Sequence, residues 1–251
     1  MKVQRFLPAL PCGSSLRIST FLETNTLVVG GTIWPTASAM SFHLLQHRAA
    51  LQRTTAVLEL GSGTGALGLF AAGLGARCTL TEHKPPRSAI EPVSYNSEGD
   101  LELPAGHSDT LMELLRGNVS HNEHLCAHRP EVMELNWTDK QQLDLVKSTS
   151  PDGRGFSTII GSDLTYNTAL LKPLVETVAQ LLSEGGTALI GHQPRLYNLT
   201  GKDSQLDEFR LASESAGLSL EVSDLPLLEQ ELNPRSLAQG KLLQLSHTGV
   251  S

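Results

Sequence analysis

Cysteine is scarce in this chain of 251 residues, and its three cysteines (Cys12, Cys78 and Cys126) lie far apart with no C-x-x-C pair. A disulfide framework is therefore not expected, and a reducing compartment fits better. The sequence also lacks an apolar run of about 18 residues, the length that suggests a membrane span. Pro8 and Pro11 interrupt the apolar stretch near its start, which argues against a signal peptide. We expect a cytoplasmic protein, with the nucleus as an alternative location, and no membrane partner.

Positive charge is also in deficit, with 19 Lys and Arg against 26 Asp and Glu and a formal net charge of −7. A protein whose main task is to hold nucleic-acid phosphates needs a basic face, so the composition disfavours a nucleic-acid partner. It permits a basic partner, such as a lysine-bearing protein segment. The length suits a single domain over residues 1–251, and we expect a monomer.

Short apolar segments alternate with helical patterns from residue 55 onward. Strands are predicted over 56–60, 77–82, 132–135, 157–162, 187–192, 218–222 and 241–245. Helices are predicted over 66–74, 110–123, 168–183 and 204–216, after a first helix that opens at Pro35. This alternation predicts βαβ units in an α/β fold, with a mainly parallel sheet covered on both faces. The last two strands are candidates for a closing antiparallel pair.

Two further segments lie outside this alternation. Residues 15–31 read as two short strands around a turn at Thr24-Asn25, which predicts an N-terminal β-hairpin. Residues 84–108 are polar, contain Pro, Gly and Ser, and show no helical stripe. We interpret them as an inserted loop after the second strand, with disorder as the ordinary reading of such a composition.

A glycine-rich turn follows the first predicted strand, in the sequence AVLELGSGTG at residues 56–65. Gly61 and Gly63 allow the backbone to approach a ligand closely, and the helix start that follows offers free N–H groups. Glu82 ends the next strand, where an acid can accept hydrogen bonds from ribose hydroxyls. Glu59 would repel a pyrophosphate and suits a cationic group, such as the amino-acid end of S-adenosylmethionine. The sequence therefore predicts a site for a nucleoside-containing cofactor.

Several further blocks, taken with the glycine turn, give the sequence a family resemblance. They are GTIWP at 31–35, VLELGSGTG at 57–65, LTE at 80–82, LLRGNVSHN at 114–122, ELNW at 134–137, SDLTY at 162–166 and GHQPR at 191–195. In these blocks the chain resembles the seven-β-strand, Rossmann-like methyltransferases, and more narrowly methyltransferase family 16. The D-x-x-Y block is the distinguishing motif of that family, whose known members are mostly protein-lysine methyltransferases. The resemblance implies a Rossmann-like, seven-stranded, mostly parallel sheet with helices on both faces.

The resemblance also implies roles for nine residues, to which the charge argument above adds Glu59. Those expected to bind S-adenosylmethionine are Trp34, Glu59, Gly61, Ser62, Gly63, Glu82, Trp137 and Ser162. Asp163 and Tyr166 are expected to face the substrate as catalytic residues. Two of these residues also admit ordinary structural roles, since Asp163 can cap the following helix and Trp137 can be a core residue. The family more often has Asp where this chain has Glu82.

By the same resemblance, the reaction is methyl transfer to a lysine of a protein substrate, for which chaperones, ATPases and translation factors are candidates. Other acceptors stay open: a protein histidine or arginine, a small molecule or a nucleic-acid base. A chain that binds cofactor or partner without turnover is a further alternative. The group His121, His124, Cys126 and His128 has zinc-like spacing but lacks a closed ligand set, so we read it as a solvated helix end and predict no metal.

Overall fold

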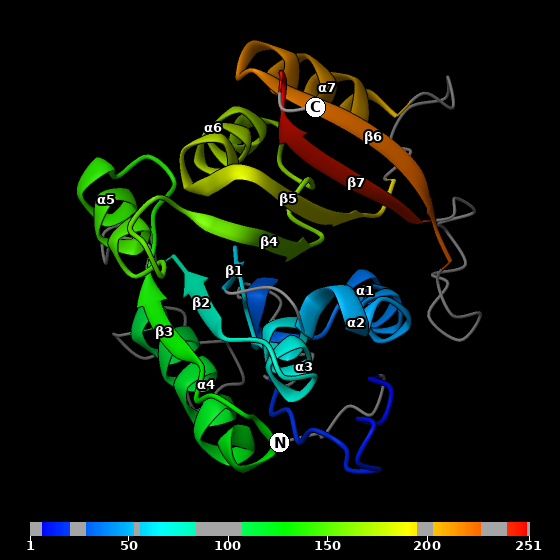
Figure 1. The fold of residues 1–251 in the computed structure, drawn as a ribbon, viewed down its shortest axis with the longest axis vertical. Helices are drawn as coiled ribbons and strands as arrows, with labels where there is room; N and C mark the ends of the chain where they lie inside the picture. Colours follow the sequence, from blue (N-terminus) through cyan, green and yellow to red (C-terminus); the bar gives the residue numbers. More distant parts are fainter. Residues whose placement is uncertain are drawn as a thin grey trace, which may run out of the picture.

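The computed structural model describes residues 7–20, 29–52, 56–83, 107–194, 203–226 and 240–249. Within them, a seven-stranded sheet has the strand order β3-β2-β1-β4-β5-β7-β6 (Figure 1). The strands are β1 Val57–Glu59, β2 Cys78–Glu82, β3 Glu131–Glu134, β4 Phe156–Ser162, β5 Leu182–His192, β6 Leu218–Leu225 and β7 Gly240–His247. Each predicted strand begins and ends within two residues of an observed strand, apart from the start of β5 and the end of β6.

The directions of the strands place the functional edge of the sheet. The pairs β3–β2, β2–β1, β1–β4 and β4–β5 are parallel, whereas β7 runs antiparallel to both β5 and β6. The chain leaves β1 toward β2 on one side and returns to β4 on the other. The carboxyl ends of β1 and β4 therefore form the switch point at which ligands bind in open α/β sheets. The expected closing antiparallel pair is confirmed as β6 and β7.

Helices cover both faces of this sheet (Figure 1). They are α1 Pro35–Gln46, α2 Arg48–Gln52, α3 Ala66–Gly73, α4 His107–Asn122, α5 Lys140–Ser148, α6 Leu171–Leu181 and α7 Ser204–Ser215, with 3-10 turns η1 Val29–Gly31, η3 Glu123–Leu125 and η4 Thr168–Leu170. One core cluster joins α1, α3 and α4 to the sheet, and the other joins α5, α6 and α7. The Rossmann-like fold class is therefore confirmed. No helix in the described parts of the chain is both long and apolar enough to cross a membrane.

Helix α6 shows how the sequence builds these layers. Leu171, Leu174, Val178 and Leu181 recur every three or four residues, and all four are at most 2% exposed. That spacing places them on one helical face, which packs into the second core cluster. Burying each such side chain contributes about 1.5–3 kcal/mol, so a charge at Val178 would disrupt the layer.

The structure corrects three boundaries. The helix predicted over 168–183 begins as the 3-10 turn η4 and ends at Leu181, because the chain then joins the sheet, where Leu182 pairs with Phe156. The glycine pair at 185–186 therefore lies inside β5 and does not end a helix. Residues 107 and 108, which were assigned to the inserted loop, are the first residues of α4; the rest of that loop lies outside the described residues.

The N-terminal β-hairpin is not confirmed. Residues 7–20 contain no regular strand, and Val29–Gly31 is a 3-10 turn where the second strand was expected. Residues 21–28, which include the predicted turn, lie outside the described residues. Helix α5 was not predicted at all; it begins at the N-cap Asp139, whose carboxylate accepts hydrogen bonds from the Gln141 and Gln142 N–H groups.

Two asparagines of α4 fasten the N-terminal segment to the core. Asn118 accepts a hydrogen bond from the Ser19 N–H at 2.8 Å and donates to the Ser19 carbonyl at 3.0 Å. Asn122 makes the same pair of bonds with Arg17, both at 2.8 Å. Asn118 also donates to the Thr64 carbonyl at 2.9 Å, and so connects this segment to the glycine turn. Both asparagine side chains are 1% exposed. They hydrogen-bond to the backbone N–H and carbonyl groups of residues 17 and 19, as a neighbouring strand would.

We expect Asn118→Ala to lower the free energy of unfolding by about 2–4 kcal/mol, because buried partners lose hydrogen bonds and the Thr64 carbonyl loses its donor. Chemical denaturation monitored by circular dichroism measures this loss. Ser120→Ala, an exposed position on the same helix, is the control and should change stability by less than about 0.5 kcal/mol. Equal stability of the parent and Asn118→Ala would contradict the assigned role.

Candidate active site

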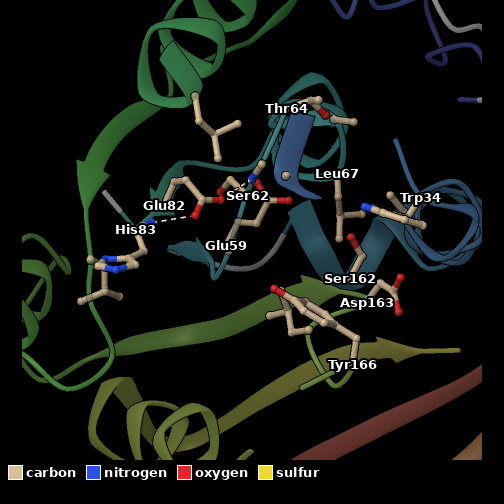
Figure 2. Close-up of a pocket in the computed structure, with 18 of the residues that line it drawn as sticks. Trp34, Glu59, Ser62, Thr64, Leu67, Glu82, His83, Ser162, Asp163 and Tyr166 are labelled. Atoms are coloured by element: carbon tan, nitrogen blue, oxygen red, sulfur yellow. Dashed lines mark hydrogen bonds between the residues drawn. The ribbon is translucent and has the colours of Figure 1, made fainter. Parts of the chain in front are cut away.

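A cavity of about 440 Å³ lies at the carboxyl ends of β1, β2 and β4. All ten residues singled out from the sequence line it: Trp34, Glu59, Gly61, Ser62, Gly63, Glu82, Trp137, Ser162, Asp163 and Tyr166. Figure 2 shows Glu82 and His83 toward one end, Glu59 and Ser62 in the middle, and Trp34, Ser162 and Asp163 toward the other end. The fold therefore brings segments that are far apart in the sequence to one site at the switch point.

The glycine turn has a backbone conformation and a packing that residues with a Cβ atom would not tolerate. Gly61 and Gly63 have φ values of 56° and 52°, in the left-handed region that favours glycine. A Cβ atom on Gly63 would lie 2.6 Å from the Gly30 carbonyl oxygen, and one on Gly61 would lie 2.6 Å from a methyl carbon of Leu164. The turn is thus packed between η1 and the loop after β4, which leaves backbone as its surface toward the cavity.

Glu82 supports this turn with its carboxylate. Its Oε2 atom accepts a hydrogen bond from the Gly63 N–H at 2.7 Å, and its Oε1 atom accepts one from the His83 N–H at 2.7 Å. Burial raises the pKa of Glu82, and these two hydrogen bonds act in the opposite direction because they favour the charged form. Each carboxylate oxygen has a further lone pair, so Glu82 can still accept hydrogen bonds from a ligand.

Glu59 is the most unusual group in the cavity wall. It is 2% exposed, and its Oε2 atom has no hydrogen-bond partner in the described part of the chain. Burial raises the pKa of Glu59 to about 8, the nearby Ser62 hydroxyl and Gly68 N–H partly oppose this rise, and the Glu82 carboxylate adds to it. A buried carboxyl group of this kind favours a cationic ligand, because a positive charge would stabilise its ionised form.

We expect Glu59→Gln to stabilise the cofactor-free protein increasingly as the pH rises. Below about pH 4.5 the Glu59 carboxyl group is neutral in both states, and the folded state loses stability as the pH rises from there through about 8. Glutamine does not titrate, so the variant should gain on the order of 2–4 kcal/mol over the parent between pH 5 and pH 9. Denaturation curves at several pH values measure this difference.

Glu208→Gln, an exposed position on α7, removes the same charge and is the control. If the free energies of unfolding of Glu59→Gln and the parent differed by a constant amount from pH 5 to pH 9, the assigned burial of the Glu59 carboxyl group would be contradicted. A pH-dependent difference of the same size in the Glu208→Gln control would also contradict it.

Apolar surface flanks the polar wall. Trp34, the residue before the first turn of α1, and Trp137, which follows β3, are both half-buried and line the cavity. Trp137 also packs against the second core cluster, so its two sequence-based interpretations, core residue and cavity wall, both apply. A flat indole face at a cavity provides a surface on which a planar ring can stack.

The sequence reasoning missed several lining residues, among them Leu67, His83, Leu111, Leu135 and Asn136. His83 directly follows Glu82, and Leu135 and Asn136 lie within two residues of Trp137, so closeness in sequence to predicted site residues is a usable signal. His83 is notable because its Nδ1 atom is buried without a hydrogen-bond partner among the described residues. Leu67 and Leu111 come from helices, and only the packing of α3 and α4 places them at the cavity.

Asp163 occupies a strained position at the end of β4. Among the described residues it is the one non-glycine residue with positive φ, at 54°, a conformation that costs about 1–2 kcal/mol for most side chains. Its backbone N–H donates to the Gly191 carbonyl of β5 at 2.8 Å, and the residue is 4% exposed. Strained residues persist where the surrounding structure holds them, and they cluster at functional sites.

The alternative role of Asp163 as a helix cap is not found. Asn167 caps the following 3-10 turn, accepting a hydrogen bond from the Ala169 N–H at 3.1 Å, and Leu170 occupies the N-cap position of α6. Asp163 instead lies in the cavity wall beside Ser162 (Figure 2). Tyr166, which is 38% exposed, also lines the cavity and lies nearer to solvent.

The charge of the cavity limits what it can bind. Three carboxyl groups line it, from Glu59, Glu82 and Asp163, whereas no Lys or Arg occurs among its described lining residues. A pyrophosphate would find no counter-charge here and would face Glu59. A nucleoside with a positively charged end fits the glycine turn, the acid at the end of β2 and the buried carboxyl group of Glu59. The described residues contain no group of three or more His, Cys, Asp or Glu side chains that could hold a metal ion.

Solved structures place the fold in a known class. The chain superimposes on magnesium protoporphyrin IX methyltransferase from Synechocystis PCC 6803 with bound SAH at a TM-score of 0.53, covering 91% of this chain and 89% of that one at 14% sequence identity. The same enzyme with bound SAM gives a TM-score of 0.50. At such identities the likeness shows the fold alone. Fold and cavity together define a Rossmann-like α/β protein with a site suited to a nucleoside that has a positively charged end.

Sequence comparison identifies the family. The model of the lysine methyltransferase family matches residues 14–209, so the chain belongs to this family, and the family's methyl donor, S-adenosylmethionine, is its cofactor. It is 24% identical to protein N-terminal and lysine N-methyltransferase EFM7 of Yarrowia lipolytica over 86% of this chain and 77% of that protein. It is 29% identical to protein N-lysine methyltransferase METTL21A of Mus musculus over 67% of this chain, which is 62% of that protein's length.

We expect Gly61→Arg to abolish binding of S-adenosylmethionine, because any side chain at this position meets Leu164 and an arginine would fill the cavity. Isothermal titration calorimetry measures the affinity. Gly153→Arg is the matched control: Gly153 is also left-handed, with φ of 69°, but has open space around its Cβ position. The control should bind within about threefold of the parent, since it leaves the site intact. Unchanged affinity in Gly61→Arg would show that the cofactor binds elsewhere.

Proposed function

We propose that the protein transfers a methyl group from S-adenosylmethionine to a lysine side chain of a protein substrate. The observation that carries this proposal is the placement of Asp163 at the wall of an acidic cavity, next to the more exposed Tyr166. The names of the relatives in yeast and mouse, which describe protein lysine methyltransferases, support the same acceptor. A net charge of −7 also suits a basic protein segment as the substrate.

The cofactor residues are proposed to divide the cavity as follows. Glu59 and Ser62 hold the charged amino-acid end, together with the glycine turn and Trp34. Glu82 accepts hydrogen bonds from the ribose hydroxyls, and Trp137 packs against the adenine ring. Ser162 lies along the edge between the cofactor and Asp163. The arrangement is supported by the order of Glu82, Glu59 and Trp34 along the cavity (Figure 2) and by the unpartnered carboxylate oxygen of Glu59.

The bound cofactor supplies a methyl group that is already activated for transfer, so the chain's own residues mainly position and desolvate the acceptor. A lysine amine must first lose a proton, since an ammonium group has no lone pair. Asp163 accepts a hydrogen bond from the amine and orients its lone pair, while the proton passes to solvent. Tyr166, placed toward the solvent, packs against the lysine stem.

The cavity gives less support to the other acceptors. A nucleic-acid base would bring phosphates to a lining without described Lys or Arg residues.

The α-amino group at the start of a protein has the same chemistry as a lysine amine, and the Yarrowia relative is named for both. Histidine, arginine and small-molecule acceptors are distinguished from lysine by the product of the reaction.

We expect Asp163→Asn to keep S-adenosylmethionine binding and to lower methyl transfer at least about 100-fold, the scale expected for a group that handles the reacting proton or its hydrogen bond. Asparagine tolerates the left-handed backbone, so the change removes the charge and leaves the conformation. The assay adds the enzyme and tritiated cofactor to extract from cells that lack it, and mass spectrometry identifies the labelled residues.

Asp144→Asn, an exposed position on α5, is the control and should match the parent. Parent-level transfer by Asp163→Asn would contradict the role of Asp163. Label in nucleic acid, in small molecules or on residues other than lysine would contradict the proposed acceptor.

A further inference from the structure

A chain of polar side chains, two of them buried, attaches the loop that carries Asp163 and Tyr166 to β5 and α7. The Thr165 hydroxyl contacts Nδ1 of His192 at 2.5 Å, and Nε2 of His192 contacts Oδ2 of Asp203 at 2.7 Å. Thr165 is 1% exposed and His192 is fully buried. Neither residue lines the cavity, so any effect on the reaction is indirect.

The chemistry of the three groups fixes the direction of their hydrogen bonds. The ionised Asp203 carboxylate can only accept, so Nε2 of His192 carries a proton. In the neutral ring Nδ1 is then an acceptor, and the Thr165 hydroxyl donates to it. The two bonds therefore connect the Thr165 hydroxyl to the Asp203 carboxylate through the imidazole.

This link joins the acceptor loop to two other elements. His192 is the last residue of β5, and Asp203 is the N-cap of α7, where its Oδ1 atom accepts a hydrogen bond from the Leu206 N–H at 3.1 Å. The helix adds a second attachment, because the Gln205 side chain donates to the Tyr166 carbonyl at 3.0 Å. The loop is thus held by its side chain at Thr165 and by its backbone at Tyr166.

The same loop has to hold Asp163 in its unfavourable left-handed conformation. The Asp163 N–H bond to the Gly191 carbonyl adds one rung to the β4–β5 ladder, immediately before His192. A strained residue stays in place only where its surroundings over-determine it. Thr165, two residues later, supplies a buried hydrogen bond at the other side of Asp163.

We propose that His192 is a positioning residue for methyl transfer, which acts with Asp203 through Thr165 to hold Asp163 and Tyr166 in their working positions. This inference rests on the proposed role of Asp163 in the acceptor site. It assigns the N-terminus of α7 a part in the reaction although α7 contributes no residue to the described lining of the cavity.

Thr165→Val tests the link with little change of volume, because it removes the hydroxyl and keeps the branched shape. Thr165→Ser is the matched rescue, since it keeps the hydroxyl. Hydrogen exchange of the peptide that covers residues 163–166, followed by mass spectrometry on the cofactor-free protein, reports loop positioning without any need for activity. We expect Thr165→Val to exchange at least about tenfold faster there and Thr165→Ser to exchange like the parent.

Methyl transfer to proteins of the enzyme-deficient extract is the second measurement. We expect Thr165→Val to lower the turnover number at least about tenfold with cofactor affinity unchanged within about threefold, and Thr165→Ser to restore turnover. Ser213→Ala removes another buried hydroxyl bond, from Ser213 to the Phe209 carbonyl on α7, and controls for general destabilisation. It should lower the melting temperature without affecting exchange at residues 163–166 or turnover.

The outcomes separate this inference from the proposed function. Parent-like exchange of residues 163–166 in Thr165→Val would overturn the positioning role, whatever the activity. Turnover losses that follow the melting temperature equally in Thr165→Val and Ser213→Ala would also overturn it. A parent enzyme that labels no lysine would contradict the proposed function, while the exchange result would still decide whether His192 and Asp203 hold the loop.

Discussion

The contact between Glu82 and the glycine turn is the interaction on which the rest of the site depends. The turn after β1 is left-handed at Gly61 and Gly63, where a Cβ atom would collide with Leu164 or with the Gly30 carbonyl. At the end of β2, the Glu82 carboxylate accepts a hydrogen bond from the Gly63 N–H at 2.7 Å. One acid therefore both shapes the turn and presents acceptor atoms to the cavity.

Charge determines which ligand this geometry serves. Burial raises the pKa of Glu59 to about 8, so the wall of the cavity carries a carboxyl group that is poorly solvated. A cationic amino-acid end removes that conflict, and a phosphate group would increase it. Asp163 extends this acidic lining, and in the proposed reaction it holds the neutral amine of the acceptor by a hydrogen bond. A single sign of charge along the cavity thus suits both substrates of a methyl transfer to lysine.

The loop after β4 shows how much support one reactive position requires. Asp163 is strained, and its neighbours attach the loop to β5 through Gly191 and His192 and to α7 through Asp203 and Gln205. None of these attachments can be predicted from the D-x-x-Y block, because His192 and helix α7 lie outside it. The loop after β4 is therefore held in place by two elements beyond the one that carries its named residues.

The order of strands and helices, the glycine turn, the acid at the end of β2 and the D-x-x-Y block could all be recognised in the sequence, because each depends on local periodicity or on residues close together in the chain. All ten predicted site residues line one cavity for that reason. Other features depended on tertiary structure. Leu182 left its predicted helix because pairing with Phe156 outweighs local helix propensity, and Leu67 and Leu111 reach the cavity only through helix packing. The left-handed Asp163, the unpartnered oxygen of Glu59 and the link from Thr165 to Asp203 arise where distant segments meet, so no local pattern in the sequence records them.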